Sequence, residues 1–348
     1  MREAADIDLS QRQREILRGV VEGYVSTGEP VGSRTLVERI RLNASASTVR
    51  SELAELEARG LLMHPHTSAG RVPTERGYRY YADRVLERLD PQPEGFPLDL
   101  SSARSEVDAA LEATTEMLSE LTRLLALVSA PPLGTATVRH VEVLVLQPHV
   151  VMVVVITSTG SVTKSVHRFS EPVDSGLVNW AAQYLNERVV GLELGSHALR
   201  RRLDDPSLGA RESAFLEPVR ALFGEAFAAE GQSLYVGGTA GLLEDLREEE
   251  LDAYQRLLEV LEERAALLEV VSQALDSRRP FVRLGPELEH PGMRDLALVG
   301  ASYGLTNRTL GAVTLVGPVR MDYEKALRSV RAAAHELSRF VEEIYEDN

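Results

Sequence analysis

Hydrophobic residues near the start of the chain recur at three- and four-residue steps, which is the spacing of one face of an α-helix. Ser10 followed by Gln13 has the spacing of a capping box, so we expect the first helix to begin there. Gly28 and then Pro30 are typical of a helix end. The apolar positions that define the buried face of this helix are Ile16, Leu17, Val20, Val21, Tyr24 and Val25.

Two shorter helices are predicted next. The first lies in VGSRTLVERI (31–40) and the second in ASTVRSELAELEARG (46–60), and we expect Ser33 and Ser45 to cap them. Two short helices joined by a turn of about four residues, with small polar residues opening the second, form the helix-turn-helix pattern. The inward-facing residues would be Leu36, Val37, Ile40, Val49, Leu53 and Leu56.

A β-hairpin is predicted directly behind the third helix. LLMH (61–64) and RVPT (71–74) are short strand-like segments, and a polar loop joins them. This loop is longer than a connection requires, since most connections are about 4–6 residues long. We expect it to reach outward as the wing of a winged helix; the alternative is a hairpin tip that is merely long. Thr74 predicts the cap of a fourth helix, and the Pro-rich segment 90–97 predicts a linker.

The rest of the chain mixes helical and strand-like patterns. Apolar positions from Val107 to Val128 predict one long helix that Pro131 ends. Further helices are predicted over much of 173–230 and over the acidic segments 241–263 and 264–276, with a closing helix from Tyr323. The predicted strands are residues 140–147, 150–157, 161–169, 280–288, 295–305 and 308–321. Three strands, a helical interruption and three more strands indicate one α+β domain that hosts an insertion.

Composition narrows the class of protein. The chain has 348 residues and no cysteine, which excludes disulfides, thiol catalysis and cysteine-ligated zinc. The longest apolar run, Val150 to Ile156, is far shorter than the ~20 residues that cross a bilayer. The first residues carry no signal-peptide pattern. We therefore expect a cytoplasmic protein with no membrane partner.

Charge is distributed unevenly along the chain. The net charge of the whole chain is −15, which by itself argues against a nucleic-acid partner. Between Ser10 and Arg84, however, 12 Arg outnumber 9 Asp and Glu, whereas residues 91–348 carry a net charge of −15. Such asymmetry is a hint of nucleic-acid contact by the basic part; the alternative is that a net charge of +3 over these residues has no functional meaning.

Candidate DNA contacts lie on the third helix and in the loop. Ser47, Thr48, Arg50 and Ser51 face away from the apolar side of the helix near its N-terminus, where a recognition helix meets base edges and phosphates. Arg50 has the donors to pair with a guanine edge. The alternative is that Ser45 and Thr48 only cap the helix and that Arg50 is solvated. Arg71 at the base of the loop, with His66, Thr67 and Ser68 at its tip, offers donors to a phosphate or to the minor groove.

PHTSAGRVPT followed by GYRYY (65–74 and 77–81) resembles the heat-inducible transcription repressor HrcA family, as do SLYVGG and GAVTLVGPVRMDYEKAL further on. The resemblance covers essentially the whole chain. It implies a winged helix (1–90), a GAF-like α+β domain (91–170 and 241–348) and an inserted, mainly helical dimerisation domain (171–240). The function it implies is a homodimeric repressor of chaperone and chaperonin operons, bound to an inverted-repeat operator in double-stranded DNA, with the chaperonin modulating its activity.

The same resemblance completes the set of expected DNA-binding residues. Ala46 departs from the family, which commonly has proline there, and Arg34 and Arg76 stand where relatives carry lysines. The set is Arg34, Ser45, Ser47, Thr48, Arg50, Ser51, His66, Thr67, Ser68, Arg71, Thr74 and Arg76.

The sequence offers no catalytic constellation. Gly237 to Gly241 is glycine-rich but is not followed by Gly-Lys-Ser/Thr, and no Gly-x-Ser-x-Gly elbow occurs. His64 and His66 have no carboxylate cluster nearby in the sequence that would complete a metal site. We expect no enzyme activity, cofactor or metal. Two alternatives stay open: a winged-helix regulator that senses a small molecule in its second domain, and a protein-interaction module that uses the winged helix for docking.

Overall fold

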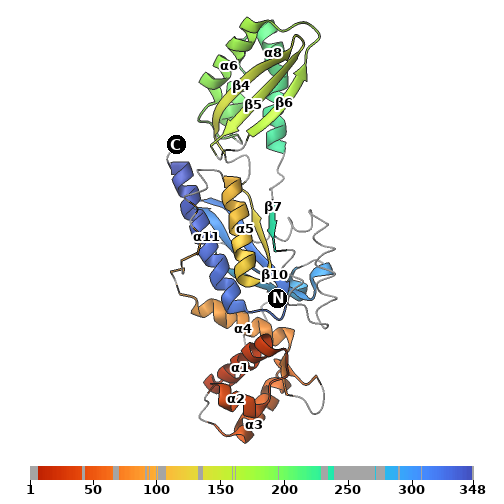
Figure 1. Cartoon of the computed structure of the whole chain (residues 1–348), viewed down its shortest axis with the longest axis vertical. Helices are drawn as coiled ribbons and strands as arrows, with labels where there is room; N and C mark the ends of the chain where they lie inside the picture. The colour runs from red at the N-terminus through yellow and green to blue at the C-terminus, as the bar shows by residue number, and fades with distance from the viewer. Residues whose placement is uncertain are drawn as a thin grey trace.

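The computed structural model describes residues 7–40, 44–65, 70–90, 92–93, 95–98, 100, 107–131, 136–158, 160, 162–194, 196–228, 234–238, 271, 279–288, 291–306 and 308–346. Its elements form three groups along one long axis, with the N-terminal helices at one end (Figure 1). The α+β class is confirmed, since helices and sheets are both present in quantity and occur in separate runs.

The N-terminal group contains three helices, α1 (Gln11–Thr27), α2 (Ser33–Ile40) and α3 (Ala46–Ala58). The predicted capping box is present, because Ser10 and Gln13 each bond the other's backbone N–H. Gly28 ends α1 in the left-handed conformation, at φ 72°. Ser33 is the first residue of α2. The predicted inward residues Leu36, Val49, Leu53 and Leu56 are all buried.

A short hairpin and a fourth helix follow α3. Strands β1 (Leu62–Met63) and β2 (Val72–Pro73) pair antiparallel, and α4 spans Glu75–Arg88. Thr74 caps α4 as predicted, accepting a hydrogen bond from the backbone N–H of Gly77. The hairpin loop residues 66–69 lie outside the described residues.

The middle group is an antiparallel sheet of five strands in the order β7-β3-β10-β9-β8. Helices α5 (Val107–Thr122) and α11 (Tyr323–Glu346) pack on it side by side (Figure 1). One buried cluster runs from the N-terminal helices into this sheet, so these two groups share a continuous core. The strands are β3 (Leu125–Ser129), β7 (Leu234–Gly237), β8 (Phe281–Leu284), β9 (Leu296–Leu305) and β10 (Arg308–Pro318).

The prediction of one helix from Val107 to Val128 is wrong at its C-terminal end. The helix ends at Thr122, Arg123 adopts a positive φ of 58°, and the chain continues as β3. All five residues of β3 are buried, because it lies inside the sheet between β7 and β10. A strand buried on both faces is apolar at most positions, so a helical spacing of apolar residues can continue into it by chance.

The third group has its own sheet and its own core. The three predicted strands are present as β4 (Val138–Gln147), β5 (Val150–Thr157) and β6 (Val162–Arg168), and they form a three-stranded antiparallel sheet. Three helices complete this group: α6 (Ser175–Val189), α7 (His197–Leu203) and α8 (Ala210–Ala228). Residues from Ala136 to Phe223 make up a buried cluster separate from the other one.

This packing corrects the expected grouping of the strands. We expected 140–169 to belong with the later strands and an insertion to begin near 171. Instead β4, β5 and β6 share no sheet with β8, β9 and β10, and β4 packs on α6. The separate core therefore begins near residue 136, and this group contains three described strands beside its three described helices instead of being mainly helical. The predicted helices 241–263 and 264–276 lie outside the described residues, except for Val271.

Candidate nucleic-acid interface

The N-terminal end of α3 exposes the side chains that the sequence singled out. Val49 is fully buried beneath it, whereas Ser47, Arg50 and Ser51 are exposed. Among the described residues Arg50 makes no ion pair or hydrogen bond, so its guanidinium is free to meet a ligand. This amphipathic division holds α3 against α1 and α2 and turns a polar face outward.

Three hydroxyls at the start of α3 form one hydrogen-bonded group. Ser45 accepts from the backbone N–H of Thr48 at 3.2 Å and caps the helix. Its Oγ also lies 2.8 Å from Ser47 Oγ and 2.9 Å from Thr48 Oγ1. These residues fit both interpretations, a helix cap and a DNA contact. Ser45 and Thr48 form the cap, and the group of three hydroxyls stays exposed at the positive end of the helix dipole.

The root of the hairpin is locked to α3 by a carboxylate that the sequence reasoning missed. Glu57 Oε2 lies 2.8 Å from Arg71 Nη2, and Glu57 Oε1 lies 2.7 Å from His64 Nδ1. Glu57 stands in the last turn of α3, where the helix dipole disfavours a negative charge. A carboxylate at such a position indicates a cationic partner nearby. This feature of the sequence could have predicted the ion pair between Glu57 and Arg71.

The same contacts set the pKa of Glu57. Partial burial opposes ionisation, but the hydrogen bond with His64 and the charge of Arg71 outweigh it and lower the pKa of Glu57. Arg71 itself is mostly buried, with 13% of its side chain exposed. Its side chain therefore faces α3 rather than outward, in contrast to the expected phosphate contact.

Backbone bonds fix the hairpin root from the other side. The N–H of Val31 donates to the carbonyl of Arg71, and the N–H of Arg71 donates back, at 2.9 and 3.0 Å. Gly70 makes this approach possible, since a Cβ there would lie 2.4 Å from the carbonyl carbon of Val31. The root of the hairpin is thus tied to the segment between α1 and α2.

The remaining predicted residues divide into structural and exposed ones. Thr74 is structural: besides capping α4, its hydroxyl donates to the carbonyl of Gly60 at 2.7 Å. Arg34 on α2 and Arg76 on α4 are exposed and make no ion pair with the described residues. His66, Thr67 and Ser68 lie outside the described residues. The structure thus brings together Ser45, Ser47 and Thr48 on α3, leaves Arg34, Arg50 and Arg76 exposed, and holds Arg71 in an ion pair.

Neither a metal cluster nor a membrane-crossing helix is present in the described part of the chain. No group of three or more His, Asp or Glu gathers there in a way that could hold a metal ion. No described helix has the length and hydropathy needed to cross a bilayer.

Comparison with known proteins places the chain in the class of transcription repressors. Residues 108–327 match the family model for the HrcA protein C-terminal domain. The heat-inducible transcription repressor HrcA of Acidothermus cellulolyticus is 34% identical over 96% of this chain and 99% of its own length. The protein of the same name from Streptomyces avermitilis is 36% identical, again over 96% and 99%. The chain belongs to the heat-inducible transcription repressor HrcA family, whose members are regulators rather than enzymes.

One solved structure shares the fold across nearly the whole chain. A crystal structure of a hypothetical protein at 2.2 Å resolution has a TM-score of 0.62 and 23% identity, covering 97% of this chain and 98% of that one. At this identity the likeness concerns the fold alone.

Proposed function

We propose that this chain is a negative regulator of heat-shock (chaperone and chaperonin) operons that binds an inverted-repeat operator as a homodimer. Residues 7–90 act as a winged helix-turn-helix, with α3 as the recognition helix and the β1–β2 hairpin as the wing. The five-stranded sheet with α5 and α11 is a GAF-like domain, and the β4–β6 group is the inserted dimerisation domain. The chaperonin modulates the activity of the repressor.

The observation that carries the proposal is the exposed, unpaired Arg50 near the start of α3, on the same helix whose last turn holds a wing root that is fixed on two sides. A contact held by rigid neighbours loses little conformational entropy when it binds. Arg50 and the hydroxyls of Ser47 and Ser51 supply donors to base edges and phosphates. Arg34 and Arg76 add exposed cations for the DNA backbone. Arg71 positions the wing through Glu57.

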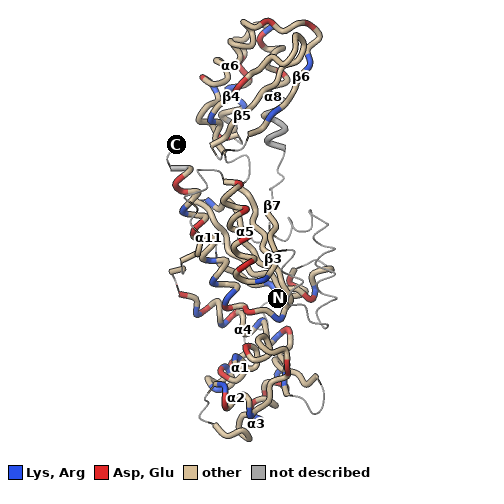
Figure 2. The backbone as a smooth tube through the Cα atoms, in the orientation of Figure 1, with Lys and Arg blue, Asp and Glu red and all other residues tan. Residues whose placement is uncertain are grey.

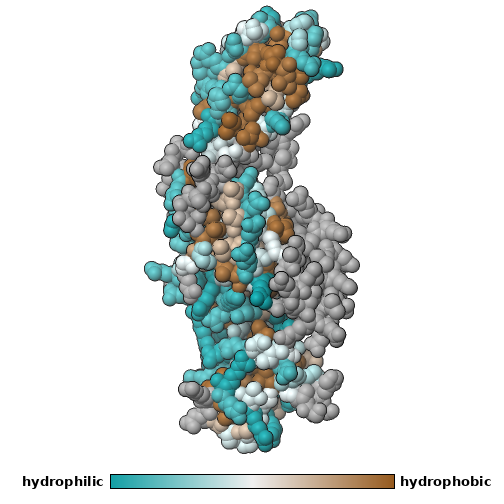
Figure 3. All heavy atoms as spheres, in the orientation of Figure 1, coloured by the Kyte–Doolittle hydropathy of each residue, from teal (hydrophilic) through white to brown (hydrophobic). Residues whose placement is uncertain are grey.

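The outer face of the three-stranded sheet supports dimerisation. Cross-strand pairing aligns Leu144 with Met152 and Met152 with Val166, and it likewise aligns Ile156 with Val162. Leu144, Val162 and Val166 are 39%, 58% and 57% exposed. Hydrophobic residues gather over this sheet at the end of the molecule away from α3 (Figure 3). An exposed apolar patch of this kind marks an interaction surface, and a second copy is the partner that a palindromic operator requires.

Binding to operator DNA tests the proposal. Fluorescence anisotropy compares an inverted repeat from upstream of the chaperonin genes with a scrambled duplex, across salt from about 50 to 200 mM. We expect tight binding to the repeat and weaker, steeply salt-dependent binding to the scramble. Arg50→Ala should weaken the binding free energy for the repeat by about 1–3 kcal/mol and reduce the preference for the repeat over the scramble. If wild-type protein binds both duplexes equally even with purified chaperonin added, the proposal is wrong.

The oligomeric part has its own test. Val166→Glu places a charge on the apolar sheet face and should convert a dimer to a monomer in sedimentation velocity. Binding to the full repeat should then fall, while binding to a half-site stays the same. Arg201→Glu, on an exposed position of α7, is the matched control and should leave the dimer intact. A monomeric wild-type protein at micromolar concentration would contradict this part alone.

A further inference from the structure

A cleft of about 470 Å³ opens where the N-terminal helices meet the middle group. Residues of α1, α4 and α11 line it, together with the start of the segment after α4. These three helices come together at the junction, on the side of α1 away from α3 (Figure 1). The cleft is therefore distinct from the proposed DNA-contacting face. Its volume lies in the range of small-molecule sites, about 300–1,000 Å³.

The lining of this cleft is strongly cationic in a chain of net charge −15. Six arginines line it, against two carboxylates, Asp90 and Glu324. A smaller hollow shares three of these arginines, so the positive region continues along α1. Basic segments meet at this junction (Figure 2). The six are Arg14, Arg18, Arg84, Arg88, Arg328 and Arg331.

Carboxylates neutralise only part of this charge. Arg18, Arg84 and Arg328 each pair with a glutamate on their own helix, at 3.7, 2.5 and 2.6 Å, in exposed or half-exposed pairs. Arg14 instead donates to the backbone carbonyl of Leu9. Arg14 and Arg88 form no ion pair with the described residues. Like charges crowded on one surface repel each other, and a bound anion relieves that repulsion.

Two buried polar side chains meet at the wall of the cleft. Tyr80 lines the cleft and is 3% exposed, and the Arg84 guanidinium lies 5.0 Å from the centre of its ring. The Tyr80 hydroxyl and Arg84 Nε are both buried, and neither has a hydrogen-bond partner of good geometry, although the two side chains interact with each other. Buried polar groups are almost always well hydrogen-bonded, so this pair keeps bonding capacity for an acceptor-rich ligand.

We propose that this cleft binds a small molecule carrying two or more phosphate groups. Arginine suits phosphate because its planar fork donates two parallel hydrogen bonds to neighbouring oxygens. Arginines from three helices match several phosphates better than a single carboxylate, which would leave most of the positive charge uncompensated. The volume admits a ligand the size of a nucleoside di- or triphosphate.

Binding there would hold the N-terminal helices in one orientation on the middle group. The lining comes from α1 on one side and α11 on the other, with α4 between them, so a polyanion would bridge the two groups. A ligand that favours one orientation shifts the population toward it. This regulatory consequence rests on the proposed DNA-binding function, whereas the binding site itself does not.

Isothermal titration calorimetry of the full chain tests the site, with inorganic tripolyphosphate, ATP and AMP as probes in about 150 mM salt. We expect saturable binding of tripolyphosphate and ATP, at one site per chain, and much weaker binding of AMP. Binding of ATP but not of tripolyphosphate would overturn recognition through the phosphates alone. Equal heats from sulfate at matched ionic strength would show unspecific ion binding and overturn the site.

A double variant assigns the binding to the cleft. Arg18→Gln with Arg88→Gln removes two exposed charges that line it, and the affinity for tripolyphosphate should fall about tenfold per arginine. Arg201→Gln with Arg202→Gln removes the same charge from exposed positions of α7 and should leave the affinity unchanged. Equal losses in both double variants would contradict the assignment.

Operator binding separates the two proposals. If the cleft regulates the protein, saturating tripolyphosphate should change the operator affinity of the wild type more than that of Arg18→Gln with Arg88→Gln. No difference would refute the regulatory consequence while leaving the site intact. If the wild type binds no operator under any condition, the proposed function fails, but the calorimetry still decides whether the site exists.

Discussion

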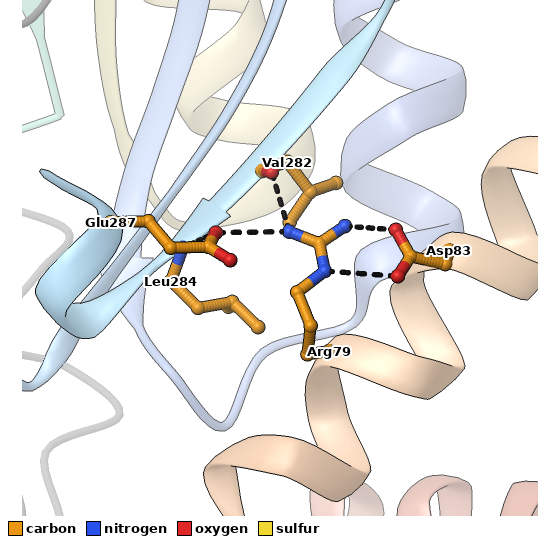
Figure 4. A network of polar contacts seen from close by, with 5 residues as sticks. All are labelled: Arg79, Asp83, Val282, Leu284 and Glu287. Carbon is orange, nitrogen blue, oxygen red and sulfur yellow. Dashed lines mark hydrogen bonds and ion pairs between the residues drawn. The ribbon is translucent and has the colours of Figure 1, made fainter. Parts of the chain in front are cut away.

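Arg79 on α4 ties the N-terminal helices to the middle sheet, and its replacement by alanine should destabilise that junction. Its guanidinium bonds three groups from two parts of the chain (Figure 4). Nε and Nη2 donate to Asp83 on the same helix, at 3.3 and 2.5 Å. Nη1 donates to the carbonyl of Val282 on β8 at 2.6 Å and to Glu287 Oε2 at 3.2 Å. Only 14% of the Arg79 side chain is exposed.

The magnitude follows from what the substitution leaves behind. Removing one partner of a fully buried ion pair costs about 3–5 kcal/mol. Asp83 and Glu287 are 33% and 40% exposed, so water resolvates them in part and lowers the cost. The Val282 carbonyl loses a charge-assisted hydrogen bond, which is worth about 1.5–3 kcal/mol. We therefore expect Arg79→Ala to lower the free energy of unfolding by about 2–3 kcal/mol, and Arg79→Lys by about 1 kcal/mol, because lysine keeps the charge but loses the fork.

Urea denaturation followed by far-ultraviolet circular dichroism measures this loss. Arg76→Ala is the matched control, since Arg76 lies one turn earlier on α4 and is exposed. Trp180, the single tryptophan of the chain, lies in α6 within the separate core, so its fluorescence should shift less than the dichroism. Equal destabilisation by Arg79→Ala and Arg76→Ala would refute the reasoning.

Three further predictions concern α3 and the wing. Glu57→Gln should destabilise the protein at pH 7, and the difference from wild type should vanish in acid. Because the pKa of Glu57 in the folded protein is lowered from the usual value of 4.5, its ionised form stabilises the fold above that value, and this stability is lost as the pH falls through the folded-state pKa. Denaturation curves at pH 7 and at about pH 3 measure the difference. Gly70→Ala should weaken operator binding by about 1–3 kcal/mol, because its Cβ would push the hairpin away from Val31; unchanged anisotropy titrations would contradict this. Ser45→Ala should cost about 1 kcal/mol of stability through the lost cap of α3, whereas Ser45→Asp should restore it in the same melts.

Local signals in the sequence were sufficient for the helix ends of the N-terminal group. Ser10, Gly28, Ser45 and Thr74 each act within a few residues of their own position, and the structure confirms all four as helix caps. Such caps depend on short-range hydrogen bonds, so one sequence suffices to predict them.

Elsewhere the predictions from sequence were wrong where contacts between distant parts of the chain decide the structure. Leu125 and Val128 continue a helical spacing, but they lie in a strand because β7 and β10 bond to its two edges. The sequence likewise contained no sign that β4–β6 and β8–β10 belong to different sheets, since strand pattern alone does not specify which strands pair. Arg71 was expected to face DNA, yet its carboxylate partner stands on another element, 14 positions away in the chain. Partners at such separations are set by the fold and not by local pattern.

Helix α4 connects the candidate interface to the rest of the molecule, and its contacts show why. Thr74 at its start is bonded to Gly60 behind α3, so the cap of α4 is also part of the wing root. Tyr78 and Tyr81 pack against Tyr323 of α11, with ring centres 6.1 and 6.5 Å apart, inside the core that both groups share. Close-packed side chains transmit a displacement instead of absorbing it. Any change that tilts α4 on the sheet, whether loss of the Arg79 contacts or occupation of the arginine cleft, must therefore move the wing root relative to the middle group.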